Sequence, residues 1–280
     1  MMNFVCPVCL RELTDTGAAY CCSAGHSFDK SKFGYVNLLQ SQKSSSKRHG
    51  DDRLMVRARR DFLDKGYYGF LLDELCGICE KYLPCSARIL DAGCGECYYS
   101  SEIKKRLADK NFEFAGIDIS KNALEYASKR KSGISTAVAS LFSLPLADNS
   151  CDAVLNIFSP EANGEFLRVL KNGGILIRVI PLEKHLFGLK AEIYEKPYEN
   201  DVPPAECAGF ELLESRALRR ETELQSNEDI LNLFKMTPYY YKTGKEDQQK
   251  IASLCSLKTQ VEFEIRVYAA KNKRERGRRK

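Results

Sequence analysis

The nine residues at positions 89–97, ILDAGCGEC, carry most of the information about the fold. An apolar strand, expected over residues 88–92, runs into a glycine-rich turn, and Tyr98 then opens a helix. Gly93 and Gly95 let a ligand approach the backbone closely, because neither residue has a Cβ atom. A dinucleotide-binding turn would need a third glycine where Tyr98 stands, so the pattern argues against a bound pyrophosphate.

Two acidic residues frame this turn. Asp91 precedes it, and Asp118 ends the next expected strand, where a carboxylate accepts hydrogen bonds from ribose hydroxyls. With the later turn LKNGG at residues 170–174, the set resembles the motifs of class I methyltransferases, whose glycine turn passes beside the methionine part of S-adenosylmethionine. The last glycine of that motif is Cys97 here, which leaves the backbone less freedom. The sequence therefore predicts an S-adenosylmethionine-dependent methyltransferase, with Asp91, Gly93, Gly95 and Asp118 at the cofactor.

Four potential metal ligands lie near the N-terminus. Cys6, Cys9, Cys22 and His26 give the spacing C-x2-C-x12-C-x3-H, which places two ligands on each of two tight turns, as a structural Zn²⁺ site requires. Cys21 competes with Cys22, since adjacent residues of an extended chain point opposite ways and only one can reach the metal. A segment of about 36 residues has little core without a metal, so structural zinc is predicted.

Strand-like and helix-like runs alternate from Arg60 onward, which is typical of a mostly parallel sheet with helices on both faces. The predicted fold class is α/β, a class I (Rossmann-like) methyltransferase domain preceded by a small zinc-binding domain. Strands are expected over residues 88–92, 112–119, 134–139, 151–158, 174–180, 211–218 and 261–270, and helices over 98–108, 122–131, 161–170 and 227–235. The predicted divisions are a zinc-binding module (1–36), a linker (37–59), the methyltransferase domain (60–270) and a basic tail (271–280).

The positive charge is unevenly distributed along the chain. The net charge is +5, and the last ten residues, KNKRERGRRK, carry seven cations and one anion. A second basic stretch covers residues 41–60 and includes Arg57, Arg59 and Arg60. Cationic groups gain affinity for polyanions by releasing counterions, so RNA is the predicted partner, and the alternative for these arginines is a solvent-exposed helix face. No apolar run of 18 residues and no signal-peptide pattern is present, which predicts a cytoplasmic protein with no membrane partner.

Longer segments make the chain similar to a particular family. From the N-terminal cysteines to about residue 270 it resembles the bacterial 23S rRNA (guanine-N1-)-methyltransferases of the RlmA type. The segments that carry this resemblance are CPVC with the later C-x3-H, HSFDKSKFGYVNLL, RARRDFLDKGYY, LDAGCGECYY, SLPLADNSCDAVLNIFSP, KHLFGLKAEIY and MTP.

The resemblance implies specific sites and a specific reaction. It places zinc at Cys6, Cys9, Cys22 and His26, and cofactor contacts at Tyr68, Gly95, Glu96 and His185. It implies methylation of N1 of a guanine in a hairpin loop of 23S rRNA, by a homodimer whose zinc modules line a cleft for the RNA stem-loop. Because N1 lies on the Watson–Crick edge, the base must be unpaired or flipped out before it reacts.

The acceptor side of the site is less clearly marked. The residues NIFSP at 156–160 stand where amino-methyltransferases carry an N-P-P-aromatic motif. Phe158 is a candidate to stack on the base and Asn156 to hydrogen-bond near the methyl group, and packing at a strand end is the alternative for both. No general base is assigned. Two other functions remain open: a non-catalytic RNA-binding or assembly protein with a methyltransferase fold, and a methyltransferase for a small molecule or a protein.

Overall fold

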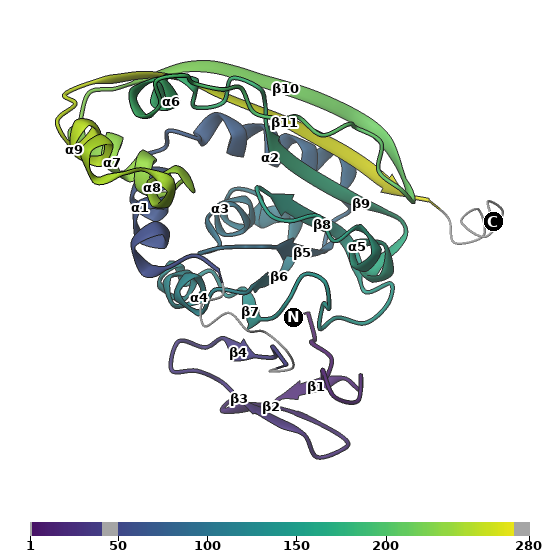
Figure 1. Ribbon diagram of the computed structural model, residues 1–280. Coiled ribbons are helices and arrows are strands. Elements are labelled where there is room, and N and C mark those ends of the chain that lie inside the picture. Colours follow the sequence, from purple (N-terminus) through teal and green to yellow (C-terminus); the bar gives the residue numbers. More distant parts are fainter. Residues whose placement is uncertain (1, 41–49, 272–280) are drawn as a thin grey trace.

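The computed structural model describes residues 2–40 and 50–271, and its centre is an eight-stranded sheet (Figure 1). The strand order is β10-β11-β9-β8-β5-β6-β7-β4. Pairing is parallel from β4 through β9 and antiparallel on both sides of β11, so the predicted mostly parallel α/β fold is confirmed. The strands are β4 (Val36–Asn37), β5 (Arg88–Ala92), β6 (Glu113–Asp118), β7 (Ser135–Val138), β8 (Cys151–Ile157), β9 (Leu170–Pro181), β10 (Phe210–Leu224) and β11 (Leu257–Ala270).

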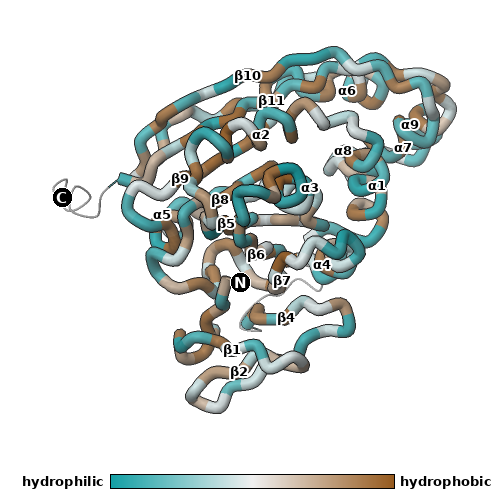
Figure 2. The backbone as a smooth tube through the Cα atoms, turned by 180° about the vertical axis from the view of Figure 1, so that it is seen from behind, coloured by the Kyte–Doolittle hydropathy of each residue, from teal (hydrophilic) through white to brown (hydrophobic). Residues whose placement is uncertain are grey.

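Helices cover both faces of this sheet, because its inner strands are apolar on both sides. Within β5, Ile89 belongs to the core cluster under α2 and α3, and its neighbour Leu90 belongs to the cluster on the opposite face. Apolar segments accordingly gather along the inner strands and the inward-facing helices (Figure 2). The helices are α1 (Arg53–Asp64), α2 (Gly69–Tyr82), α3 (Tyr98–Arg106), α4 (Lys121–Ala127), α5 (Asn163–Val169), α6 (Phe187–Ile193), α7 (Asn227–Lys235), α8 (Tyr239–Lys242) and α9 (Lys245–Ala252), with 3-10 turns at Ala108–Lys110 and Ser128–Arg130.

The N-terminal module is a small antiparallel sheet, β1 (Leu13–Asp15), β2 (Ala19–Cys22) and β3 (Ser27–Asp29), that packs against the larger one. Its Phe4 and Leu13 are fully buried in the same core cluster as Leu90 and Phe166. The following strand β4 pairs in parallel with β7 and so belongs to the methyltransferase sheet. The module is therefore part of the catalytic core and not a separately tethered unit.

The linker predicted over residues 37–59 overlaps regular structure at both of its ends. Asn37 lies in β4, and the Leu38 N–H continues the pairing with the Val138 carbonyl at 2.9 Å. Helix α1 begins at Arg53, because the Asp52 carboxylate caps it by accepting a hydrogen bond from the Met55 N–H at 3.0 Å. The sequence analysis did not predict this cap and placed the start of the methyltransferase domain at residue 60. Residues 41–49 of the predicted linker and 272–280 of the predicted basic tail lie outside the described residues.

The C-terminal part of the chain builds one edge of the sheet. Strands β10 and β11 pair along almost their whole length, with a register shift between Leu212 and Glu214, and they arch across the molecule (Figure 1). Helices α7, α8 and α9 lie in the connection between them. Both strands are longer than predicted, because the polar residues at their ends also join the ladder. Among residues 2–40 and 50–271, no helix has the length and apolar character needed to cross a membrane.

Helix α6 approaches β11 so closely that only glycine fits at one contact. A Cβ atom on Gly188 would lie 2.1 Å from the Lys258 carbonyl oxygen, whereas one on Gly164 of α5 would meet nothing within 4 Å. We expect Gly188→Ala to lower the free energy of unfolding by about 2–3 kcal/mol, because helix and strand must separate. Gly164→Ala is the matched control and should change it by less than about 1 kcal/mol. Urea denaturation of both variants measures this, and equal effects would contradict the close packing.

A candidate cofactor site and a candidate metal centre

The glycine turn after β5 is held against the neighbouring strand β6. The N–H groups of Gly93 and Cys94 donate to the Ile117 carbonyl at 2.8 and 3.1 Å, and the Cys97 N–H donates to the Cys94 carbonyl at 2.8 Å. Gly93 has a φ of 80°, and a Cβ atom there would collide with the Ser159 side chain at 2.4 Å. Gly95 has a φ of 54°, and a Cβ atom there would meet nothing within 4 Å. The turn is therefore packed on one side and open on the other, as a ligand-binding turn must be.

Asp118 ends β6 beside this open side, as predicted. One of its carboxylate oxygens accepts a hydrogen bond from the Gly95 N–H at 2.8 Å, and the other accepts from the Ser120 N–H at 2.7 Å. Each oxygen keeps a second lone pair that can accept from a ligand hydroxyl. Burial raises the pKa of Asp118, and the two N–H donors oppose that rise.

Asp91 lies in β5 directly before the glycine turn and is almost fully buried. Burial raises the pKa of its carboxyl group to about 7, against the opposing effect of the Ser100 hydroxyl, and the nearby charge of Asp118 adds to the rise. A positively charged ligand group would relieve this cost, since opposite charge stabilises a carboxylate. Asp91 is thus suited to a cationic ligand.

The side chain of Glu96 is bound within the protein. Its buried carboxylate forms an ion pair with Arg130 at 2.5 Å, and Arg130 also binds Asp64 at 2.9 Å and lies over the ring of Tyr98. The side chain of Glu96 is therefore engaged in holding the turn to the segment after α4. Its backbone N–H, by contrast, has no hydrogen-bond partner within the described ranges, so only the backbone of Glu96 is offered to a cofactor.

Cys97, which replaces the last glycine of the motif, adopts the conformation that glycine would supply. Its φ is 61°, in the left-handed region that costs a non-glycine residue about 1 kcal/mol or more. The side chain points away from the open side, since its sulfur lies over Gly116 of β6. The departure from the motif is thus accommodated without closing the turn.

Three of the predicted residues converge on one aromatic ring that the sequence reading missed. The ring of Phe263, in β11, lies 4.9 Å from that of Tyr68, 4.7 Å from His185 and 5.0 Å from Phe158, between ring centres. In the sequence Phe263 is simply one more apolar residue in a strand, and nothing local marks it. Its importance comes from the antiparallel insertion of β11 between β9 and β10.

Tyr68 and His185 each present a polar group without a hydrogen-bond partner among residues 2–40 and 50–271. The Tyr68 hydroxyl is buried and has no hydrogen-bond partner among the described residues, and burial raises its pKa, so it remains a donor. His185 accepts a hydrogen bond at Nδ1 from the Glu262 N–H at 3.2 Å. Burial, together with the charge of Lys190, lowers the pKa of His185 to about 3. The imidazole is therefore neutral at physiological pH, and its proton is on Nε2.

Of the two acceptor-site candidates, the structure leaves only Phe158 free. The side-chain amide of Asn156 donates to the Ser159 side-chain oxygen at 2.5 Å and to the Pro160 carbonyl at 3.1 Å, and its oxygen accepts from Arg178 at 3.3 Å. These bonds hold the loop after β8, so the predicted contact of Asn156 with the substrate is not supported. Phe158 follows at the strand end with a φ of 54° and is 45% exposed.

The metal-ligand cluster forms as the spacing predicts. The Cys6 sulfur lies 3.5 Å and the Cys22 sulfur 3.4 Å from Nδ1 of His26, and the sulfurs of Cys9 and Cys22 lie 3.6 Å apart. All four ligand atoms lie within 4.8 Å of one another. Tetrahedral zinc separates sulfur and nitrogen ligands by roughly 3.5–3.8 Å, so the donor set fits Zn²⁺. Cys21 points elsewhere, and its thiol lies 3.4 Å from the Ser27 hydroxyl.

The three arginines expected to contact RNA are mostly paired within the protein. Arg57 and Arg60 each form an ion pair with an aspartate one helical turn later in α1. Arg59 binds Asp51 at 2.5 Å and the Met236 carbonyl at 3.2 Å, which ties the start of α1 to the end of α7. Arg59 therefore has a structural role, and of the three only Arg57, at 71% side-chain exposure, is mainly in solvent.

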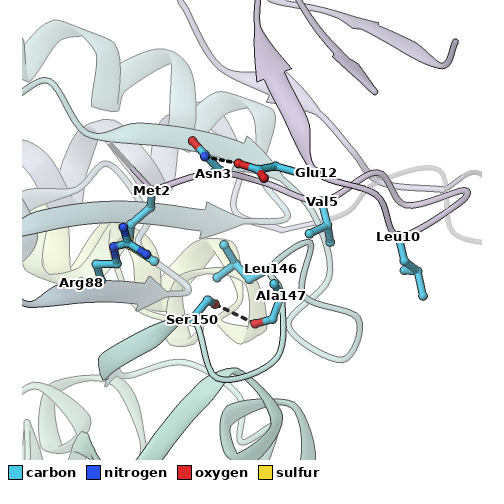
Figure 3. A pocket seen from close by; sticks show the side chains of 9 residues that line it. All are labelled: Met2, Asn3, Val5, Leu10, Glu12, Arg88, Leu146, Ala147 and Ser150. Atoms are coloured by element: carbon cyan, nitrogen blue, oxygen red, sulfur yellow. Dashed lines mark hydrogen bonds between the residues drawn. The ribbon is translucent and has the colours of Figure 1, made fainter. Parts of the chain in front are cut away.

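A cavity of 280 Å³ lies apart from this site, between the N-terminal segment and the loop before β8 (Figure 3). Its lining includes Arg88, which starts β5, whereas the glycine turn follows the opposite end of that strand. Figure 3 shows Asn3 and Glu12 bonded to each other, and the Ser150 hydroxyl bonded to the Ala147 carbonyl. This cavity is therefore at the wrong edge of the sheet for the cofactor.

The fold and the two sites together define a class I methyltransferase with an N-terminal zinc ribbon. The family model for the RlmA N-terminal zinc ribbon matches residues 4–47, and the model for a methyltransferase domain matches residues 90–178. The Bacillus subtilis protein YxjB, whose assigned name is that of a 23S rRNA (guanine-N1)-methyltransferase, is 31% identical over 94% of this chain and 95% of its own. The Streptomyces fradiae 23S rRNA (guanine(748)-N1)-methyltransferase is 33% identical over 65% of this chain and 64% of its own. The chain belongs to the RlmA-type family, and its cofactors are S-adenosylmethionine and structural zinc.

The adjacent cysteines 21 and 22 provide a matched test of the metal centre. We expect Cys22→Ser to abolish binding of one zinc ion per chain and to loosen the N-terminal module, because a tetrahedral structural site needs all four donors. Cys21→Ser should keep one zinc ion, since its sulfur lies outside the cluster. Metal analysis of the proteins purified without chelator decides the point. A full zinc content in Cys22→Ser would contradict the assignment.

The raised pKa of Asp91 predicts how stability depends on pH. Its ordinary value is 3.8 and its folded value is about 7, so the folded state disfavours the ionised form. The cofactor-free protein then loses stability as the pH rises from about 4 to about 7. Asp91→Asn removes this loss, so its unfolding free energy relative to wild type should rise by about 3 kcal/mol between pH 4.5 and pH 7.5. Urea denaturation at both pH values measures it, and a constant difference would refute the buried carboxyl.

Proposed function

We propose that this protein transfers a methyl group from S-adenosylmethionine to N1 of a guanine in a hairpin loop of 23S rRNA. The observation that carries the proposal is Phe158, an exposed aromatic ring at the end of β8. It packs against Phe263, and so do Tyr68 and His185; these four rings are called the aromatic wall. The names of the relatives from Bacillus subtilis and Streptomyces fradiae support the substrate.

The cofactor is assigned to the open side of the glycine turn. Asp118 would accept from the ribose hydroxyls, and the backbone of Gly95 and Glu96 would line the methionine part. Asp91 would face the positive charge, with Tyr68 and His185 as donors from the aromatic wall. When bound, S-adenosylmethionine supplies the electrophilic methyl group. The unpartnered Tyr68 hydroxyl and the space at Gly95 support this fit.

The acceptor base is assigned to the face of Phe158. Base–aromatic stacking contributes about 1–3 kcal/mol and tolerates an extruded nucleotide. Phe158 is rigidly presented, because Asn156 holds the loop and the Ser159 hydroxyl donates to the Ala92 carbonyl at 2.6 Å. Orienting the base in line with the methyl group is the main catalytic contribution expected of these residues.

The remaining parts of the proposal concern the assembly. Cys6, Cys9, Cys22 and His26 would hold one structural zinc ion, and the zinc module would contribute to RNA recognition. The protein would act as a homodimer in the cytoplasm, where its ribosomal substrate is made; family resemblance supports the dimer. Cys97, the departure from the glycine motif, keeps a glycine-like left-handed conformation, which favours a catalytic protein over a non-catalytic RNA-binding protein.

The assay for this function is methyl transfer to 23S rRNA followed by primer extension, because N1 methylation blocks base pairing and stops the polymerase. We expect one cofactor-dependent stop at a loop guanine. Phe158→Ala should lower kcat/KM by about 10–100-fold, and Phe158→Tyr should retain most activity, since both aromatic rings stack. Cofactor affinity should be the same in both variants.

Leu213→Ala serves as the control, because Leu213 is similarly exposed, at 43%, but lies in the edge strand β10. It should leave the rate unchanged. Methylation of small-molecule or protein pools without any stop on rRNA would decide against the proposed substrate. Equal rates for Phe158→Ala and wild type would remove Phe158 from the acceptor site.

A further inference from the structure

The cofactor turn contains a pair of cysteines with C-x-x-C spacing, Cys94-Gly95-Glu96-Cys97. The Cys97 N–H donates to the Cys94 carbonyl at 2.8 Å, so these four residues form a hydrogen-bonded turn. Such a turn brings its end residues to within about 7 Å between Cα atoms, which overlaps the range that a disulfide bond spans. The backbone therefore already has a geometry in which the two sulfurs can be joined.

The two sulfur atoms also share one space. A Cβ atom added to Gly116 of β6 would lie 2.9 Å from the Cys94 sulfur and 3.2 Å from the Cys97 sulfur. Both thiols thus lie over the same glycine, inside a small apolar cluster with Leu124 and Val138. Burial raises the pKa of Cys94, and the adjacent Cys97 thiol adds to the rise.

A cavity gives access to one member of the pair. It has a volume of 170 Å³ and lies between the zinc-module segment at Phe33 and the connection from α4 to β7. Cys97 lines it, together with Ala127, Lys131 and Thr136. Cys97 lines the cavity but is only 1% exposed, whereas Cys94, which does not line it, is 9% exposed, so a small oxidant such as hydrogen peroxide can approach the pair from either side.

We propose that Cys94 and Cys97 are a redox modification site, at which a peroxide forms a disulfide bond that weakens cofactor binding. The Cys97 thiolate attacks hydrogen peroxide, which yields a sulfenic acid and hydroxide. The Cys94 thiol then displaces the sulfenic oxygen as water and the S–S bond forms. Two thiols are oxidised, one peroxide is reduced to two waters, and an external dithiol reverses the step.

The effect on the cofactor follows from what lies between the two cysteines. Gly95 donates its N–H to Asp118, and the backbone N–H of Glu96 has no hydrogen-bond partner in the described part of the chain. Because the sulfurs are packed over Gly116, drawing them together displaces the turn and with it these two groups. Displacements of about 1 Å at a binding turn carry large penalties. This inference rests on the proposed role of the turn in binding S-adenosylmethionine.

The test compares cofactor affinity in the reduced and oxidised protein. The full-length protein is kept in dithiothreitol, or treated with hydrogen peroxide and freed of it, and S-adenosylmethionine binding is measured by calorimetry. We expect oxidation to weaken binding at least tenfold, dithiothreitol to restore it, and peptide mass mapping to find a Cys94–Cys97 disulfide. Zinc content is measured in each sample, because the ligand thiolates are also oxidisable.

Two variants identify the responsible cysteines. Cys97→Gly, whose glycine suits the φ of 61°, should show the same affinity before and after oxidation, each sample being compared with its own reduced form. Cys79→Ala removes one member of another C-x-x-C pair, Cys76 and Cys79, which lies outside the zinc site and is buried in α2, and this variant should respond to peroxide as wild type does.

The outcomes separate the two proposals. An equal loss of affinity in wild type and Cys97→Gly would assign the effect to other cysteines and overturn the redox site. A mapped disulfide without a change in affinity, or no disulfide at all, would overturn it too. In these cases the reduced protein still binds the cofactor, so the methyltransferase function stands. A reduced protein that does not bind S-adenosylmethionine overturns both.

Discussion

The hydrogen bond from the Ser159 hydroxyl to the Ala92 carbonyl joins the two halves of the site. It holds the loop after β8 against the end of β5, at the point where Gly93 leaves no room for a side chain. The same hydroxyl accepts from the Asn156 amide, whose oxygen accepts from the buried Arg178. The glycine turn and the loop that presents Phe158 are therefore fixed relative to each other by one connected network, on which the proposed cofactor and acceptor geometry depends.

The aromatic wall is the second constraint, and it comes from the far end of the chain. Phe263 in β11 contacts Tyr68 before α2 and His185 before α6, so residues almost 200 positions apart share one surface. The wall excludes water from the Tyr68 hydroxyl and keeps His185 neutral. Burying the Tyr68 hydroxyl without a hydrogen-bond partner among the described residues costs free energy, and a ligand group that bonds to it would gain that free energy as affinity.

The zinc module is joined to the catalytic domain by packing and not only by the chain. Phe4 and Leu13 enter a core cluster of the large sheet, and β4 extends that sheet beyond β7. This packing gives the module a fixed position against the catalytic domain. Within α1 the positive charges of Arg59 and Arg60 are paired with aspartates of the protein.

The sequence by itself determined the features whose physics is local. The glycine turn, the acidic strand ends at Asp91 and Asp118, the helices and strands between them, and the spacing of the zinc ligands all depend on residues close together in the chain. The cap at Asp52 is also local and was missed, because the polar stretch around it obscured the start of α1. Only the tertiary structure decided which partner each group finds. It assigned the Glu96 carboxylate to Arg130 and Asn156 to its own loop, placed Phe263 at the centre of the site, and put the thiols of Cys94 and Cys97 over Gly116. Apart from the bonds of Asn156 within its own loop, these contacts join segments that are distant in sequence, and their register follows from the packing of the whole sheet.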